Sequence, residues 1–141
     1  MINKPTALFI DDDHIEQTLY RRVATRLARF ESIELESYAD EALAKLIERP
    51  DNLPDIIFLD LNIPRMSGLE FVAAIEDRMP DRVDQLYIVI ATTSAFEGDR
   101  LLADQFRSVY GFFTKPLLQD SLSLIVEQYQ EWSQSRLRQR C

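Results

Sequence analysis

The chain of 141 residues has the length of one domain, and its net charge of −8 argues against nucleic acid or anionic lipid as a partner. Hydrophobic residues make up 46% of the sequence, enough for a buried core, and no apolar run approaches the about 20 residues needed to span a bilayer. The lone cysteine, Cys141, cannot form an internal disulfide, so we expect a soluble cytoplasmic protein.

Short apolar runs alternate with amphipathic stretches along the first half of the chain. Residues 7–10 predict a buried strand, and residues 14–30 predict a helix. The apolar residues that recur at helical spacing in this helix are Ile15, Leu19, Val23, Leu27 and Phe30. The alternating stretch 33–38 predicts an edge or half-exposed strand, and 39–50 predicts a helix that Pro50 ends.

The second half of the chain continues the same alternation. It contains predicted strands at 55–60, 86–93 and 109–115 and predicted helices at 67–79, 96–108 and about 117–138. The stretch EDRMPDRVDQL is slightly long for a connection into the strand at 86–93, which indicates a local insertion. Five strands alternating with five helices predict an α/β fold with a parallel sheet and right-handed crossovers, formed by a single domain over 1–141.

Polar residues interrupt the apolar runs where four of the predicted strands end. They are Asp11, Asp12 and Asp13, then Asp60, then Thr92 and Thr93, and finally Lys115. Ligands of open parallel sheets bind beyond the carboxyl ends of the strands, so we expect these groups to gather there. Clustered carboxylates need a compensating cation, and an all-oxygen site suits Mg²⁺. Acidic residues, metal, lysine and threonine hydroxyl together predict a phosphoryl site with a carboxylate nucleophile.

Four segments, FIDDD, LDLNIPRMSGLE, ATTS and FFTKPL, occur in this order and resemble the CheY-like receiver domain of two-component response regulators. The resemblance covers nearly the whole chain. It implies a flavodoxin-like (βα)5 three-layer sandwich with the strand order 2-1-3-4-5. It also implies Mg²⁺-dependent phosphotransfer from a sensor histidine kinase or phosphotransfer protein, with no enzymatic activity beyond self-catalysed phosphorylation and autodephosphorylation.

The resemblance also implies roles for the acidic residues. Asp60 matches the phosphoacceptor. Asp12 matches the direct metal ligand, Asp11 would act mainly through water, and the backbone carbonyl of Asn62 would complete the protein ligands. A register one residue later, with Asp12 and Asp13 as the acidic pair, stays open, although Asp11 directly follows the apolar run.

The resemblance implies three further roles by position: Thr92 as the switch hydroxyl, Lys115 as the phosphoryl-binding lysine and Phe112 as the aromatic switch. It also implies a cis peptide bond between Lys115 and Pro116. Thr93 remains a second choice for the switch hydroxyl. Phe112 lacks the hydroxyl of the tyrosine frequent in the family, so a switch there must be steric. Asn62 and Ser94 occupy the positions that tune hydrolysis of the acyl phosphate in this family.

Two other functions compete with the receiver interpretation. A Mg²⁺-dependent phosphohydrolase of the haloacid-dehalogenase type would use FIDDDHI as its Asp-x-Asp motif, with Asp11 as nucleophile and Asp13 as its partner. No later strand supplies the acidic metal ligands that such an enzyme needs. A degenerate receiver that serves as a constitutive binding scaffold is the third alternative, and the complete set of site residues argues against it.

The last predicted helix is longer than a receiver domain requires. No segment after it is long enough for a DNA-binding or enzymatic output domain, so we expect a stand-alone regulator that acts through contact with a downstream protein target or through onward phosphotransfer. Trp132 and Leu137, beyond the usual domain end, are candidates for a homodimer contact.

Overall fold

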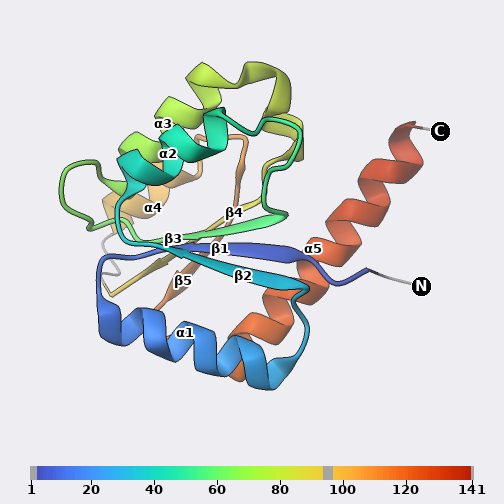
Figure 1. Ribbon diagram of the computed structural model, residues 1–141. Helices are drawn as coiled ribbons and strands as arrows, with labels where there is room; N and C mark the ends of the chain where they lie inside the picture. The colour runs from blue at the N-terminus through green and yellow to red at the C-terminus, as the bar shows by residue number, and fades with distance from the viewer. Residues whose placement is uncertain (1–2, 94–96, 141) are drawn as a thin grey trace.

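A computed structural model of the chain describes residues 3–93 and 97–140, in which helices cover both faces of a parallel sheet (Figure 1). The strands are β1 (Thr6–Ile10), β2 (Ser32–Glu36), β3 (Ile56–Leu59), β4 (Ile88–Thr92) and β5 (Val109–Thr114). The α-helices are α1 (His14–Leu27), α2 (Ala39–Ile47), α3 (Gly68–Arg78), α4 (Glu97–Ala103) and α5 (Gln119–Arg140). The strand order β2-β1-β3-β4-β5 confirms the flavodoxin-like fold.

The apolar content of each strand matches its place in the sheet. Every residue of β3 and β4 is buried, as their continuous apolar runs predict for strands covered on both faces. β2 alternates between exposed and partly buried residues and lies at one edge of the sheet, which confirms the half-exposed strand. β1 and β3 are adjacent central strands. The polar residues 11–13 directly follow β1, and Asp60 directly follows β3.

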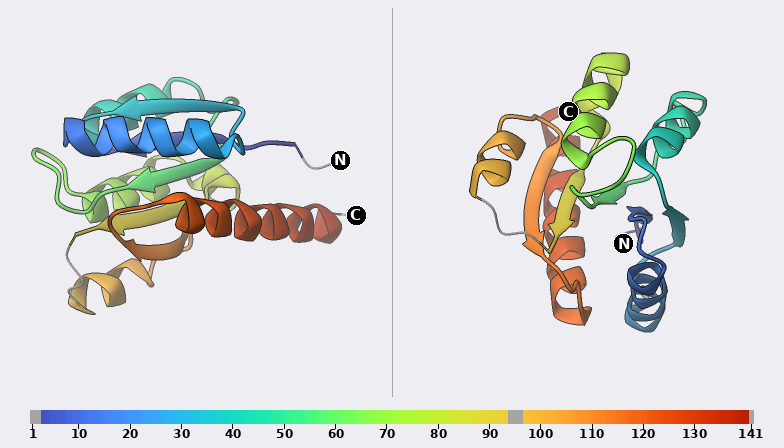
Figure 2. Two further views of the ribbon diagram at one scale, coloured as in Figure 1. Left: turned by 90° about the horizontal axis from the view of Figure 1, so that it is seen from below. Right: turned by 90° about the vertical axis from the view of Figure 1, so that its left-hand side faces the viewer.

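The helices divide between the two faces of the sheet. α2, α3 and α4 cover one face, and α1 and α5 lie side by side on the other (Figures 1 and 2). Buried residues such as Leu46, Phe71 and Ile75 form the core under α2 and α3. The opposite core contains Tyr20 and Leu122, from α1 and α5.

The face of α1 that packs on the sheet matches the predicted one in part, since Val23 and Leu27 pack against the core as expected. Tyr20 and Ala24 are the buried residues of the helix, whereas Ile15 is 80% exposed. The small side chain of Ala24 lets the helix approach the sheet, and the Tyr20 ring stacks on Phe9 of β1 at 4.8 Å between centroids. Ala28 adopts a left-handed conformation with φ 55°, so the helix ends before the predicted boundary at residue 30.

Two segments between α3 and β5 also depart from the predicted boundaries. The long connection after α3 contains a 3₁₀-helix, η1 (Pro80–Gln85). α4 ends at Ala103, whereas the sequence pattern extended this helix to residue 108. In the segment between α4 and β5, the backbone N–H and hydroxyl of buried Ser108 donate to Glu76 Oε2 at 2.9 and 2.6 Å. This contact holds the residue just before β5 against α3.

The C-terminal part of α5 packs against the sheet through aromatic rings. The Trp132 ring lies 5.0 Å from that of Tyr87 and 5.2 Å from that of Tyr110, and the Tyr129 ring packs on Tyr87 at 5.2 Å. The guanidinium of Arg136 lies 4.7 Å from the centre of the Trp132 ring. Among the residues that the structure describes, neither α5 nor another helix has the length and apolar character needed to cross a membrane.

Candidate functional site

The site begins with two backbone segments that extend the sheet by one residue. The Asp11 N–H donates to the carbonyl of Glu36 at 3.0 Å, and the Asp60 N–H donates to the carbonyl of Ile10 at 3.1 Å. The first polar residue after β1 and the first after β3 are therefore held beside each other at the carboxyl edge of the sheet. Their placement depends on the parallel pairing of the two strands and not on a flexible loop.

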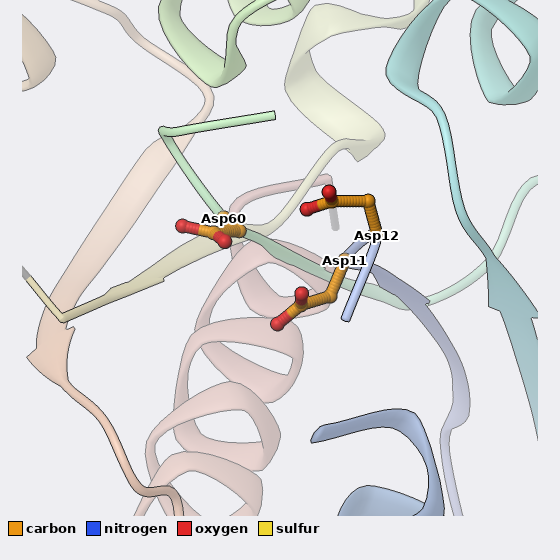
Figure 3. A group of neighbouring side chains, drawn as sticks. All are labelled: Asp11, Asp12 and Asp60. Atoms are coloured by element: carbon orange, nitrogen blue, oxygen red, sulfur yellow. The ribbon is translucent and has the colours of Figure 1, made fainter. Parts of the chain in front are cut away.

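The carboxylates of Asp11, Asp12 and Asp60 form one cluster. One oxygen of each lies within 4.8 Å of the others, and Figure 3 shows the three side chains gathered where the two strands end. Asp11 and Asp60 are buried, and Asp12 is partly exposed. Three negative charges so close together repel one another, which requires nearby positive charge.

Lys115 supplies one positive charge to this cluster. Its Nζ donates to Asp11 Oδ2 at 2.5 Å and to Asp60 Oδ2 at 3.0 Å, and its side chain is only 4% exposed. Burial by itself lowers the pKa of Lys115, but the hydrogen bonds to the two carboxylates outweigh it and the pKa is raised. Lys115 follows β5, its N–H donates to the carbonyl of Thr92 at 2.8 Å, and the peptide bond to Pro116 is cis.

The pKa of the Asp60 carboxyl is raised even though Lys115 contacts it. Burial raises the pKa of Asp60 and the charge of Asp11 adds to the increase, while Lys115 and the N–H of Asn62 lower it; the net shift is upward. The Asn62 N–H lies 3.3 Å from Asp60 Oδ1. The side chain of Asp60 is 10% exposed and that of Asp11 is 1% exposed, so Asp60 is the more accessible of the two buried carboxylates.

Asp13 has a different role from its two neighbours. Its Oδ1 accepts hydrogen bonds from the N–H groups of Ile15 at 2.8 Å and Glu16 at 3.4 Å, which makes it the N-cap of α1. Its own N–H donates to Asp11 Oδ1 at 3.0 Å. Of the two registers left open by the sequence, the structure brings the pair Asp11 and Asp12 into the cluster.

Comparison with known proteins decides which family this arrangement represents. The response regulator receiver domain matches residues 7–127. The chain belongs to this family. Receiver domains are phospho-acceptor signalling domains of two-component systems, phosphorylated on an aspartate with Mg²⁺, so the family has the chemistry that the clustered carboxylates suggest.

The similar proteins agree with this assignment. The chain is 28% identical over 124 residues to the probable C4-dicarboxylate response regulator DctR of Halalkalibacterium halodurans; the match covers 88% of this chain and 50% of that regulator. A two-component response regulator structure from Cytophaga hutchinsonii is 24% identical, with a TM-score of 0.84 and coverage of 90% of this chain and 98% of that one. The Mn(2+)-bound form of response regulator Rcp1 is 24% identical, with a TM-score of 0.69 and coverage of 87% and 91%. Helix α5 of this receiver continues past the matched residues to Arg140.

The residues expected to switch lie beside the carboxylate cluster of the receiver. Thr92 ends β4 and is buried, whereas Thr93 is exposed. Phe112 of β5 is half-buried and packs against the small core of Leu61, Ile90 and Ala103. The guanidinium of Arg100 lies 6.0 Å from the centre of the Phe112 ring. Ser94 lies outside the described residues.

Reasoning from the sequence missed the contribution of α1 to this receiver site. The Tyr20 hydroxyl donates to Asp11 Oδ2 at 3.1 Å, and Gln17 Nε2 donates to the carbonyl of Asp11 at 2.7 Å. Glu16 adds a further carboxylate nearby, and its pKa is raised. Burial is the main cause, the charge of Lys115 opposes it, and the negative charges of the neighbouring aspartates add to the increase. The available signal was a tyrosine on the sheet-facing side of a helix, because a buried tyrosine hydroxyl needs a partner.

The carboxylate cluster fits Mg²⁺ by donor type and by charge. Its donors are all oxygens, which hard divalent cations prefer, and one lysine cannot balance three carboxylates. Lys115 donates to Oδ2 of both Asp11 and Asp60, and Oδ1 accepts from one backbone N–H in each residue, that of Asp13 and that of Asn62. Each Oδ1 therefore keeps one acceptor position for a metal or its water.

Proposed function

We propose that this protein is a stand-alone response regulator that accepts a phosphoryl group on Asp60 from a sensor histidine kinase or phosphotransfer protein. The proposal is carried by the convergence of Asp11, Asp12 and Asp60 with the buried Lys115. In the reaction, an Asp60 carboxylate oxygen forms a bond to phosphorus while the phosphorus–nitrogen bond of the donor phosphohistidine breaks. The released imidazole nitrogen keeps the electron pair of that bond and takes up a proton.

Asp12, Asp60 and the backbone carbonyl of Asn62 would hold Mg²⁺, with Asp11 acting mainly through water. The ion would neutralise the charge that builds up on the phosphoryl oxygens. The structure of Rcp1, a protein of similar fold, is a Mn(2+)-bound form. Lys115 would exchange its contact with Asp60 for one with a phosphoryl oxygen, and the Thr92 hydroxyl would donate to another.

Phosphorylation adds about 1.5 to 2 negative charges at the edge of the sheet, and this charge can drive a switch. Movement of Thr92 toward the phosphoryl group would open space for Phe112, whose ring packs beside Ala103 of α4. A change in the position of Phe112 would alter the surface of α4, β5 and α5. Asn62 and Ser94 are proposed to set the lifetime of the acyl phosphate by their positions relative to Asp60 and Thr92.

Labelling with a small phosphodonor tests the proposal directly. Protein incubated with acetyl phosphate and Mg²⁺ is expected to gain the mass of one phosphoryl group, and Asp60→Asn is expected to gain none. Asp13→Asn is the matched control, because asparagine retains the N-cap of α1 and leaves Asp60 unchanged. Wild-type protein that takes no label, or carries it on another residue, would contradict the proposal and would favour a degenerate scaffold in the first case.

The phosphohydrolase alternative has no specific support in the geometry. Asp11, its proposed nucleophile, is 1% exposed, and its two oxygens accept hydrogen bonds from Lys115, Tyr20 and the N–H of Asp13. These donors reduce the nucleophilicity of the carboxylate, and its burial limits access by a phosphate ester. Multiple turnover of p-nitrophenyl phosphate would be the outcome that restores this alternative.

The output of the regulator is proposed to be contact with a downstream protein target in the cytoplasm. Exposed apolar residues on α4, on β5, on α5 and just before α5 support this part of the proposal: Leu101, Leu102, Tyr110, Leu124 and Leu118. Stand-alone status is tested by the intact mass of the protein isolated from its native cells. We expect the mass of the 141-residue chain, and a larger polypeptide would contradict it.

A homodimer is a further part of the proposal, and the structure directs its test to Leu137. Trp132 already packs on Tyr87 and Tyr110 within one chain, whereas Leu137 is exposed. Light scattering of the beryllofluoride-treated protein is expected to give the mass of a dimer for wild type and of a monomer for Leu137→Glu. Ile15→Glu, on exposed surface of α1, is the control and should stay dimeric. A monomeric wild-type protein with and without beryllofluoride would exclude the dimer.

A further inference from the structure

The carboxylate of Asp11 is held by three donors from three parts of the chain. Oδ2 accepts from Lys115 Nζ at 2.5 Å and from the Tyr20 hydroxyl at 3.1 Å, and Oδ1 accepts from the N–H of Asp13 at 3.0 Å. A carboxylate offers about two acceptor positions on each oxygen. Oδ2 is therefore saturated, and one acceptor position remains on Oδ1.

The ring of Tyr20 is itself fixed by an aromatic stack that joins the two strands of the site. It stacks on Phe9 of β1 at 4.8 Å between centroids, and Phe9 stacks on Phe58 of β3 at 4.4 Å with 7° between the planes. Phe9 and Phe58 are paired across the two strands and stand two residues before Asp11 and Asp60. Since side chains alternate along a strand, the stack lies on the face of the sheet from which α1 reaches Asp11.

We propose that Tyr20 is a positioning residue of the receiver site, whose hydroxyl orients the Asp11 carboxylate so that Oδ1 keeps its remaining acceptor position for a metal-bound water. The inference rests on the proposed function and assigns to α1 a part in cation binding. Without the hydroxyl, Oδ2 has a vacant acceptor position and the carboxylate can rotate about its bond to Cβ. Outer hydrogen bonds of this kind typically change metal affinity by 10–100-fold when they are removed.

Tyr20→Phe separates this role from packing, because phenylalanine keeps the ring on Phe9 and removes only the hydroxyl. Backbone amide NMR would follow a Mg²⁺ titration of the unphosphorylated protein, so the result does not depend on phosphotransfer. We expect about 10-fold weaker Mg²⁺ binding and a shifted Asp13 amide resonance even without metal, because that N–H contacts the carboxylate that has moved. If Tyr20 only packs in the core, Tyr20→Phe should change neither the Mg²⁺ affinity nor the Asp13 amide resonance.

The matched control is Tyr87→Phe, which removes a hydroxyl from another buried tyrosine, one that belongs to the aromatic cluster beside Trp132. Its Mg²⁺ affinity should equal that of wild type. A second test combines Tyr20→Phe with Asp11→Ala: if Tyr20 acts through Asp11, the phenylalanine substitution should have no further effect on affinity in the Asp11→Ala background.

The outcomes distinguish this inference from the proposed function. Wild-type protein that neither binds Mg²⁺ nor becomes labelled on Asp60 would overturn both. Wild-type protein that does both, together with a Tyr20→Phe variant of unchanged Mg²⁺ affinity, would overturn only the role of Tyr20. An equal loss of affinity in Tyr20→Phe and Tyr87→Phe would also overturn it, because the effect would then be general to loss of a buried hydroxyl.

Discussion

Lys115→Met is expected to lower the free energy of unfolding by about 3 kcal/mol near neutral pH and to abolish phosphoryl uptake by Asp60. Methionine fills a similar volume but leaves the buried carboxylates of Asp11 and Asp60 without the ammonium that contacts both. Removing one partner of a buried ionic group is costly because the remaining charge has no compensation. Urea unfolding and acetyl phosphate labelling measure the two effects.

The pH dependence of this loss has a definite sign. In wild type, burial raises the pKa of Asp60 and Lys115 opposes the increase, so Lys115→Met should raise this pKa further. As the pH falls through the raised pKa, the carboxylate takes up a proton and the cost of its unpaired charge disappears. The pKa of Lys115 is raised above 10.5, so the wild-type ammonium stays charged from acidic to neutral pH. Its stabilising effect is lost only when the pH rises through this raised pKa. The difference in the free energy of unfolding between Lys115→Met and wild type should therefore become smaller as the pH falls toward about 4.

Lys45→Met is the matched control for the loss of a lysine ion pair. Lys45 Nζ lies 2.6 Å from Glu36 Oε1, but its side chain is 63% exposed. We expect a much smaller loss of stability than for Lys115→Met, because water and salt screen an exposed pair. Equal losses of stability for Lys45→Met and Lys115→Met would contradict the importance of burial at the site.

Gly68→Ala is expected to destabilise the protein by about 2 kcal/mol and to slow phosphoryl uptake by Asp60. A Cβ at Gly68 would lie 2.6 Å from the carbonyl oxygen of Asp60 and 2.8 Å from Cα of Leu61. Both contacts are with backbone, which cannot move away without displacing Asp60. Alanine is favoured over glycine within helices by about 1 kcal/mol, but the clash outweighs this preference at the start of α3.

Gly111→Ala gives the comparison for this steric argument. A Cβ at Gly111 would meet the edge of the Phe113 ring at 3.0 Å and Val89 Cγ1 at 3.4 Å, and both neighbours are side chains. Thermal unfolding should therefore show a smaller loss than for Gly68→Ala, with a normal labelling rate of Asp60. If Gly68→Ala keeps wild-type stability and labelling rate, the close approach of α3 to Asp60 does not constrain the site.

The sequence by itself determined the order of the elements and the chemistry of the site edge. Continuous apolar runs identified β3 and β4 as strands covered on both faces, and alternation identified β2 as half-exposed. Since parallel strands end at a common edge, the polar residues that follow them were expected to meet there. The strand order came from the family resemblance, because periodicity identifies strands but not their neighbours.

Only the tertiary structure decided which groups contact one another. Asp12 and Asp13 are adjacent and identical in type, yet Asp12 joins the carboxylate cluster while Asp13 caps α1. Between α4 and β5, Ser108 contacts Glu76 of α3, and Tyr20 instead of Ile15 faces the sheet, where its ring stacks on Phe9. Local sequence pattern records the period of each element, whereas these contacts join residues of different elements and depend on how the helices pack on the sheet.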